Sequence, residues 1–266
     1  MKKSVFILLA VILTTGIVFF ASCTKKDAGT LICGVTEYEP MNFRDEKGNW
    51  TGFDTELAML VGEKLGMKVA FQEIDWGNKY QELQAGSINA IWNGFTANAS
   101  ENGVPRSNMV DFSYSYMYNQ QSIVVRADRT GDFKKMDDLL GKKAACESGS
   151  AGESFAIEYL EDESLITGTP AQISTFLEVK SGSVDFAVVD ILLAQRLAGS
   201  GDYSDLAIAD ITLDHEVYAV GFKKGSPLTN KVNKALKELY DSGKMMELAK
   251  KYKLENSLVL DTNFKG

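Results

Sequence analysis

Few residues of this chain have the types and spacing that support catalysis or metal binding. The 266 residues include three cysteines and one histidine, His215. A zinc site usually takes Cys or His ligands at close spacing, so we expect no metal site. Nucleophilic catalysis of the Ser–His–Asp type needs a histidine beside the nucleophile, and we find no such arrangement in the sequence. These residues predict a protein without catalytic residues, metal or cofactor.

One short segment has the composition of an anion-binding turn. Residues 149–152 read Gly-Ser-Ala-Gly and precede a predicted helix at 152–160. The first N–H groups of a helix lack intrahelical acceptors and lie at the positive end of the helix dipole, so they bind anionic groups. The segment lacks the Gly-Lys-Ser/Thr ending of a P-loop, and nucleotide binding is therefore not predicted.

The elements that would position these groups alternate between strand and helix patterns. In the first half, strands are predicted at residues 31–36, 67–73 and 88–93, with helices from Asp54, as its cap, to Gly66 and at 78–85. In the second half, strands are predicted at 143–147 and 184–189, with helices at 136–140, 152–160, 172–181 and 191–197. A strand at 218–222 and a long helical stretch at 231–251, broken at Gly243, follow. The alternation predicts βαβ units and mainly parallel sheets.

An internal repeat relates the two halves. The segment LQAGSINA at 83–90 matches VKSGSVDF at 179–186, and both read as a helix end, a Gly-Ser turn and an apolar strand. If the alignment of the two segments is extended with the same offset, Gly94 corresponds to Asp190. Because ligands of open α/β sheets bind beyond the carboxyl ends of the strands, two such lobes would hold a ligand between Gly94 and Asp190. A chance match of a common helix-to-strand turn is the alternative.

The N-terminus has the pattern of an export signal. Two lysines precede an apolar run at residues 5–20, as in a secretory signal peptide, and this run is short for a membrane-spanning helix. It ends in Phe-Ala-Ser-Cys at 20–23, which resembles a bacterial lipobox with Phe20 in place of the usual leucine. We expect a signal peptide at 1–22, acyl chains such as palmitate on Cys23, and a polar tether at 23–30. An ordinary signal peptide or an uncleaved anchor is the alternative.

The net charge, the hydrophobic content and the cysteine positions exclude further classes of protein and of covalent link. The formal net charge is −8, and there is no dense basic block, so nucleic acid is not expected as a partner. A hydrophobic content of 45% is that of a globular protein rather than a disordered one. Cys33 and Cys146 each lie in an apolar stretch, and we expect two buried thiols rather than a disulfide.

The ordered series of motifs resembles the periplasmic solute-binding proteins of ABC importers, in the branch that binds polar amino acids. The likeness covers residues 30–254. Its landmarks are GVTEYEPMNF at 34–43, GFD at 52–54, Asp75-Trp76, the segment 83–89, GFT at 94–96, Arg106 with VDFS at 110–113, GKK at 141–143, ESGS at 147–150 and VDFAVVD at 184–190.

The resemblance implies an α/β fold of the type II periplasmic-binding-protein class, a Venus flytrap of two α/β lobes joined by two hinge strands. The first lobe would comprise residues 31–119 and 215–266, and the second residues 120–214. The resemblance also implies a monomer that captures a free amino acid by hinge closure and delivers it to the permease and ATPase subunits of an ABC transporter. The protein would be exported and lipid-anchored at the periplasmic or cell-surface face of the membrane.

The resemblance assigns the contacts to the ligand carboxylate. Arg106 stands where the family binds this group, and a guanidinium donates two parallel hydrogen bonds to a carboxylate. Here five additional residues separate Arg106 from the preceding motif, so the loop must be reshaped. Gly94 and Thr96 match further donors to the same carboxylate. Ser150 and Ala151 match contacts from the second lobe.

The resemblance also assigns the groups around the rest of the ligand. Asp190 matches the acidic residue that pairs with the α-ammonium, although it could instead cap the helix at 191–197. Tyr38 and Trp76 match aromatic residues that flank the ligand side chain, with core packing as the alternative. Glu37 and Glu147 lie beside these positions. Carboxylates near an aromatic box favour a cationic ligand side chain; solvated surface acids are the alternative.

Two other functions fit the same motifs. A cyclohexadienyl-dehydratase-like enzyme on this fold would use Arg106 for the substrate carboxylate and Glu147 as a general acid. A surface or sensor lipoprotein would keep the ligand site and differ only in its partner.

Overall fold

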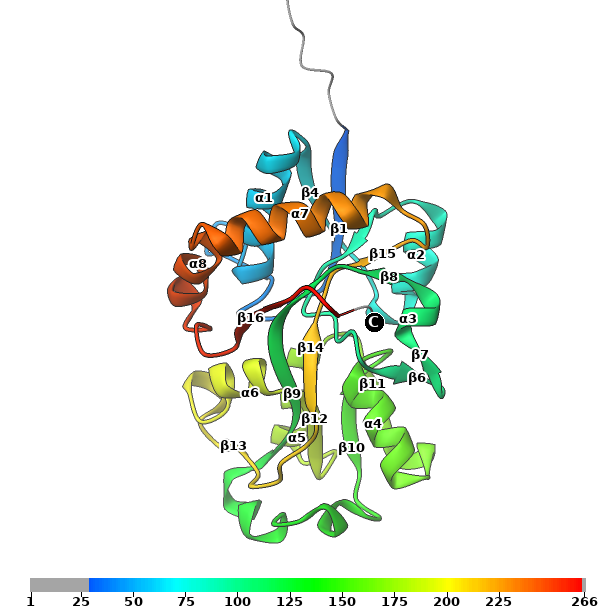
Figure 1. The fold of residues 1–266 in the computed structure, drawn as a ribbon. Coiled ribbons are helices and arrows are strands. Elements are labelled where there is room, and N and C mark those ends of the chain that lie inside the picture. Colours follow the sequence, from blue (N-terminus) through cyan, green and yellow to red (C-terminus); the bar gives the residue numbers. More distant parts are fainter. Residues whose placement is uncertain (1–28, 265–266) are drawn as a thin grey trace, which may run out of the picture.

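The computed structural model describes residues 29–264, which form two lobes, each with its own β-sheet (Figure 1). The predicted signal peptide at 1–22, the lipid site at Cys23 and the tether up to residue 28 lie outside the described residues. Among residues 29–264, none of the helices has the length and hydrophobicity needed to span a bilayer.

The first lobe is built on a five-stranded sheet with strand order β4-β1-β5-β15-β8. Its first three strands are parallel, as the βαβ pattern predicts, and β15 runs antiparallel to β5 and β8. Its strands are β1 (Thr30–Val35), β4 (Lys68–Glu73), β5 (Ala90–Ile91), β8 (Asp111–Phe112) and β15 (Gly221–Phe222). Its helices are α1 (Phe53–Leu65), α2 (Lys79–Ala85), α3 (Arg106–Met109), α7 (Pro227–Asp241) and α8 (Lys244–Tyr252). Helices α1, α7 and α8 pack against one another, so the C-terminal segment returns to the lobe in which the chain began.

The second lobe contains the parallel strands β11, β10 and β12, with β9 and β13 continuing the sheet in antiparallel pairing. Its own strands are β10 (Ala144–Glu147), β11 (Ile166–Thr169), β12 (Phe186–Asp190) and β13 (Leu206–Ile208). Its helices are α4 (Ala151–Leu160), α5 (Gln172–Ser181) and α6 (Ile191–Leu197). The predicted short helix near residue 136 is a 3-10 turn, Met136–Leu139.

Two long segments connect the lobes. Strand β9 (Ser115–Arg126) pairs first with β14 (His215–Tyr218) and β16 (Leu258–Asp261), and then enters the sheet of the second lobe (Figure 1). His215 pairs with Gln120, so the outgoing and returning crossings lie side by side. The predicted strand at 218–222 is divided, because β14 ends at Tyr218 and β15 begins at Gly221.

Helix α1 begins differently from the prediction. Its N-cap is Gly52, at φ 114°, and no side chain caps it. A Cβ at Gly52 would lie 2.3 Å from the carbonyl oxygen of Met41, so the turn requires glycine. The predicted cap at Asp54 is wrong: its buried carboxylate accepts hydrogen bonds from Gly94 N at 2.7 Å and Tyr116 OH at 2.9 Å. Burial raises the pKa of Asp54 to about 7.

The internal repeat corresponds to one structural motif in each lobe. Helix α2 ends at Gly86, at φ 80°, before β5, and α5 ends at Gly182, at φ 77°, before β12. Left-handed glycines are common at helix C-termini because glycine has no Cβ to clash there. The prediction of buried thiols is also confirmed, since Cys33 in β1 and Cys146 in β10 are free and buried.

Candidate ligand-binding site

A small cavity lies between the lobes, beyond the carboxyl ends of β1, β5, β10 and β12. Its volume is about 10 Å³, which is close to the space of one water molecule. The lobes therefore stand close together over it. The lining residues are Thr36, Tyr38, Trp76, Asn93, Gly94, Thr96, Arg106, Glu147, Ser150, Ala151, Gln172 and Asp190. Of the ten predicted ligand contacts, Glu37 alone is missing from this set.

The residues inserted before Arg106 form a small hairpin. Strands β6 (Ser100–Glu101) and β7 (Val104–Pro105) pair, and the turn residues Asn102 and Gly103 both have positive φ. An Asn-Gly pair is the preferred sequence for such a two-residue turn. Arg106 follows directly as the first residue of α3, and its side chain is buried. The insertion thus leaves Arg106 in the cavity lining.

The guanidinium of Arg106 is held from two sides. Its Nη1 donates to the carbonyl oxygen of Thr96 at 3.0 Å, and its Nη2 donates to the carbonyl oxygen of Gly149 at 3.1 Å. The ring of Phe95 lies below it, 4.9 Å from Cζ. The buried Nε has no hydrogen-bond partner among the described residues. One donor of the guanidinium is therefore available to an acceptor.

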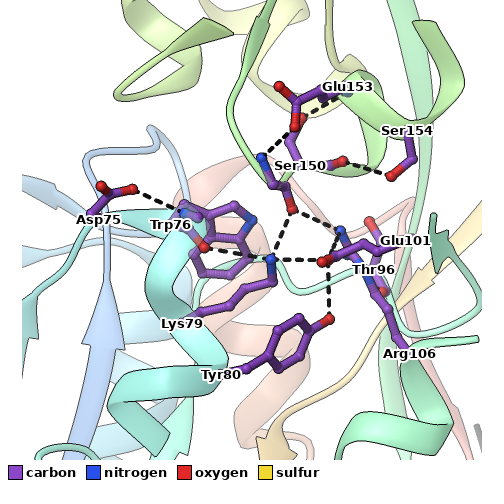
Figure 2. Close-up of polar contacts among 12 residues, drawn as sticks. Asp75, Trp76, Lys79, Tyr80, Thr96, Glu101, Arg106, Ser150, Glu153 and Ser154 are labelled. Atoms are coloured by element: carbon purple, nitrogen blue, oxygen red, sulfur yellow. Dashed lines mark hydrogen bonds and ion pairs between the residues drawn. The ribbon is translucent and has the colours of Figure 1, made fainter. Parts of the chain in front are cut away.

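The second lobe presents the start of α4 to the same cavity (Figure 2). The Ser150 hydroxyl caps the helix by accepting from Glu153 N at 3.0 Å, and the Glu153 carboxylate accepts from Gly149 N at 2.7 Å. Ala151 is the first helical residue and lines the cavity. Because the first N–H groups of a helix have no intrahelical partner, this end can receive a carboxylate opposite Arg106.

A carboxylate of the cavity lining, Asp190, is held by amide groups. Asp190 accepts from Asn119 Nδ2 at 2.5 Å, from Gln121 Nε2 at 2.8 Å and from Gln172 Nε2. Its side chain makes no capping bond to α6, so its structural contacts are to these amides. Burial raises the pKa of Asp190, while the amide hydrogen bonds oppose this rise.

Glu216 is a second acid at this position, and sequence reasoning missed it. Its Oε2 accepts from Thr96 Oγ1 at 3.1 Å, Asn119 Nδ2 at 2.7 Å and Gln121 Nε2 at 3.0 Å. Burial and the neighbouring Asp190 raise its pKa to about 7. No local motif distinguishes Glu216 from other acids, because its partners come from distant segments.

The hydrogen bonds of Thr96 and Gly94 differ from those expected. The Thr96 hydroxyl donates to Glu216 and the Gly94 N–H donates to Asp54, so both predicted ligand donors contact protein carboxylates here. Gly94 is nevertheless required at the wall: its φ is 55°, and a Cβ would lie 2.5 Å from Cε1 of Tyr38.

The two predicted aromatic residues both line the cavity and pack against lobe 1. Tyr38 OH lies 2.6 Å from Tyr218 OH, and the two rings meet edge to face. The Trp76 ring meets Phe95 edge to face at 5.6 Å between centroids. Tyr38 and Trp76 thus pack against neighbouring rings as the alternative predicts, and because they also line the cavity, ligand contact remains a prediction for both.

The two glutamates that were predicted to favour a cationic ligand side chain differ in their position relative to the cavity. Glu147 is only 3% exposed, and its Oε1 has no partner among the described residues. Burial, and then Asp190, raise its pKa to about 8, against the opposing charges of Lys79 and Arg106. Glu37 has a side chain that is 44% exposed and lies 3.6 Å from Arg44, away from the cavity. The reason is local: β1 ends at Val35, and in the loop that follows, Thr36 and Tyr38 line the cavity whereas Glu37, between them, is turned to the surface beside Arg44.

Lys79 is a further buried cation that the sequence did not indicate. Its Nζ donates to Gly149 O at 2.8 Å and lies 2.9 Å from Glu101 Oε1 (Figure 2). Burial, and then Arg106, lower its pKa to about 8. Within a helix pattern a lysine normally predicts an exposed position, so its burial depends on the neighbouring loops.

The site therefore pairs opposite charges across a small enclosed space. Arg106, the start of α4 and Asp190 line the cavity, and Glu216 shares its amide donors Asn119 and Gln121 with Asp190. This arrangement is complementary to a small molecule with a carboxylate and an ammonium group. Residues 29–264 contain no group of three or more His, Cys, Asp or Glu side chains placed to hold a metal ion.

Comparisons with known proteins identify the family of the chain. Residues 31–255 match the family described as bacterial extracellular solute-binding proteins, family 3. The chain is 29% identical over 261 residues to the arginine-binding extracellular protein ArtP of Bacillus subtilis (strain 168), covering 95% of this chain and 98% of ArtP. It is similar to the structure of an ancestral arginine-binding protein bound to arginine, with 32% identity, a TM-score of 0.76, and coverage of 84% of this chain and 98% of that one. It is also similar to the ancestral amino acid-binding protein AncCDT-1, a precursor of cyclohexadienyl dehydratase, with 30% identity, a TM-score of 0.74, and coverage of 84% and 95%.

Proposed function

Because the chain belongs to the bacterial extracellular solute-binding proteins of family 3, we propose that it captures one free amino acid between its lobes for an ABC importer. The observation that carries this proposal is the charge arrangement of the interlobe cavity. Arg106, whose buried Nε has no partner among the described residues, and the carboxylate residue Asp190 both line this cavity. A buried charge without a counter-charge costs several kcal/mol, so a zwitterion suits this site better than a simple anion or cation.

Lobe closure supplies the mechanism of capture. Arg106, Thr96 and Tyr38 of the first lobe would receive the ligand, and Asp190 and Ser150 would complete the cage. A further ion pair joins the lobes at the rim, between Arg196 Nε and Glu39 Oε1 at 2.7 Å. A ligand that binds the closed form better than the open form shifts the equilibrium toward closure.

For the ligand class, we propose a polar amino acid with a basic side chain. Glu147 lines the cavity with an unpaired Oε1, and its pKa of about 8 leaves it mostly neutral at pH 7. A ligand ammonium or guanidinium beside this group would supply the missing donor and stabilise its ionised form. The two arginine-binding relatives favour the same class.

We propose further that the chain binds its ligand without transforming it. A dehydratase of this fold would need Glu147 to deliver a proton to a leaving group. The amide donors that surround Asp190 suit it instead to a stable contact with an ammonium ion. The similarity to AncCDT-1, itself an amino acid-binding protein, is compatible with binding alone.

The partners follow from the family. We propose that the closed lobes present a composite surface to a membrane permease with its ATPase, and that acyl chains on Cys23 hold the protein at the membrane. We propose that the protein acts as a monomer, as the resemblance to the family implies. A surface sensor with the same ligand site would differ in lacking the permease.

Thermal unfolding of the chain from Thr24 onward, measured against each of the twenty amino acids, tests this function. A ligand that binds only the folded state raises the melting temperature by mass action. We expect a rise with arginine, lysine or histidine. A rise with neutral amino acids alone would keep the function and remove Glu147 as a selector. No rise with any amino acid, for folded protein freed of bound ligand, would refute the proposal, and turnover of prephenate or arogenate would then indicate the enzyme.

A further inference from the structure

The β6–β7 hairpin brings a carboxylate to the outer side of Arg106. Glu101 lies in β6, where it pairs with Val104 of β7. The backbone N–H of Arg106 donates to Ala99 O at 3.0 Å, so the base of the hairpin adjoins the arginine. The hairpin thus brings Glu101, which precedes Arg106 by five residues, next to the arginine side chain.

Three donors converge on one oxygen of Glu101 (Figure 2). Its Oε1 lies 2.9 Å from Lys79 Nζ and 2.9 Å from Arg106 Nη2, and it accepts from Tyr80 OH at 3.0 Å. The side chains of Lys79 and Arg106 are 0% and 1% exposed. A carboxylate shared by two buried cations offsets the repulsion between them, and burial protects these contacts from screening by salt.

The same two cations reach across to the second lobe. Lys79 Nζ donates to the carbonyl oxygen of Gly149 at 2.8 Å, and Arg106 Nη2 donates to it at 3.1 Å. Gly149 precedes the start of α4, where Ser150 lines the cavity. Glu101 therefore gathers the cations at the point where the lobes meet.

Glu101 stands behind the cavity rather than in it. Arg106 and Trp76 line the cavity, whereas Glu101, Lys79 and Tyr80 do not belong to its lining. Glu101 takes up Nη2 and leaves the buried Nε without a partner among the described residues. The carboxylate thus does not replace a ligand; it orients the guanidinium so that another donor remains for one.

We infer that Glu101 is a positioning residue that orients Arg106 toward the ligand carboxylate and, with Lys79, ties the first lobe to Gly149 when the lobes close. The inference rests on the proposed function and adds residues to it. The inserted hairpin is then a part of the binding site, because it supplies Glu101 as the counter-ion of Arg106.

The charge state of Lys79 gives this role a signature of its own. The charged groups that face its ammonium are Arg106, which lowers its pKa, and Glu101 and Glu147, which raise it. Without the negative charge of Glu101, less attraction balances the repulsion between Arg106 and the Lys79 ammonium. The pKa of Lys79 should therefore fall below its value of about 8.

Glu101→Gln tests the inference through ligand binding. We expect the Kd for L-arginine to rise about tenfold or more, because a charge-assisted contact to Arg106 is replaced by a neutral one. The Kd for L-argininamide, which lacks the carboxylate, should rise by a clearly smaller factor, since the weakened contact to Gly149 affects both ligands whereas the orientation of Arg106 affects only the ligand with a carboxylate. Glu46→Gln, in the exposed turn between β2 (Phe43–Arg44) and β3 (Trp50–Thr51), is the matched control and should change neither value.

Equal losses for L-arginine and L-argininamide in Glu101→Gln would mean a general structural effect and would overturn the inference. Unchanged binding of both would overturn it as well, while the proposed function would stand.

A pH titration of Lys79 without ligand tests the role of Glu101 separately from the proposed amino-acid binding. The ¹³Cε resonance of Lys79, assigned with Lys79→Ala, should titrate at a lower pH in Glu101→Gln than in the wild type. An unchanged titration would overturn the pairing of Glu101 with Lys79 even if the wild type bound no amino acid. A wild type that binds neither probe would count against the proposed basic ligand, and against the role of Glu101 in binding one.

Discussion

Glu147→Gln is the substitution that tests the proposed basic ligand most directly. The carboxyl group lines the cavity, is 3% exposed and has one oxygen without a partner among the described residues. Its pKa is raised to about 8, first by burial and then by Asp190. A raised pKa means that the group is neutral below about pH 8 and ionised above it. A cationic ligand side chain that needs the ionised form must therefore bind more tightly as the pH rises.

The size of this effect follows from the raised pKa. With a pKa of about 8, about 1% of the group is ionised at pH 6, about 9% at pH 7 and half at pH 8. If arginine binds only the ionised form, its Kd should fall about ninefold from pH 6 to pH 7 and about fivefold from pH 7 to pH 8. Binding at pH 7 should release about 0.9 proton per arginine.

Titration calorimetry in two buffers of different ionisation enthalpy measures both the Kd and the protons released. Citrulline is the neutral ligand control, because it matches arginine in shape and carries the same α-amino and α-carboxyl groups. Contributions from Glu216, whose pKa is about 7, and from Asp190 act on those shared groups, so they cancel in the ratio of the two Kd values.

Glu147→Gln should remove the pH dependence of this ratio and most of the preference for arginine. The variant should not unfold at lower temperature than the wild type, because it removes an acid whose ionised form is destabilised by burial. A wild-type ratio that stays constant from pH 6 to pH 9, or a pH dependence that persists in the variant, would refute the reasoning.

Three further substitutions test other parts of the site and of the chain. Asp190→Asn should raise the Kd for the amino acid about 100-fold or more, since the α-ammonium loses its buried counter-charge; calorimetry showing less than a tenfold change would remove Asp190 from that role. Gly94→Ala should lower the melting temperature, at a cost of about 1–3 kcal/mol, because its Cβ would lie 2.5 Å from the Tyr38 ring at a φ of 55°. Gly131→Ala, with no atom within 4 Å of its added Cβ, should leave the melting temperature nearly unchanged, and equal effects of the two would contradict the packing argument. Cys23→Ala should move the protein from the membrane to the soluble fraction, and retention in the membrane would indicate an uncleaved anchor.

Local sequence signals located most of the regular elements of the two lobes. The predicted helices at 172–181 and 191–197 have the bounds of α5 and α6. Gly66, Gly86 and Gly182 end helices in the left-handed conformation, as their positions indicate. Such signals are reliable because a helix end depends on the φ and ψ of a few neighbouring residues.

Strand β9, the longest in the structure, was not located by its sequence pattern. Its centre reads Tyr-Asn-Gln-Gln-Ser at residues 118–122, which interrupts the apolar run expected of a buried strand. The structure explains these polar residues: Asn119 and Gln121 donate to the carboxylates of Asp190 and Glu216. The polar side chains that hold these carboxylates therefore interrupt the apolar pattern by which β9 could have been predicted.

The α/β class and the two-lobed organisation could be predicted from periodic patterns and ordered motifs, because these are local properties of the chain, and the family resemblance pointed to Arg106 and Asp190 as cavity residues. Which acids are buried, and how burial shifts their protonation, depends on the tertiary structure. Glu147, Lys79 and Glu216 depart from their ordinary pKa values because burial removes water and because charges from distant segments face them. Glu101 and Lys79 are 22 positions apart and meet at 2.9 Å only because the hairpin folds back onto α2. Desolvation and Coulomb interactions sum over neighbours in space, and the order of residues along the chain does not specify those neighbours.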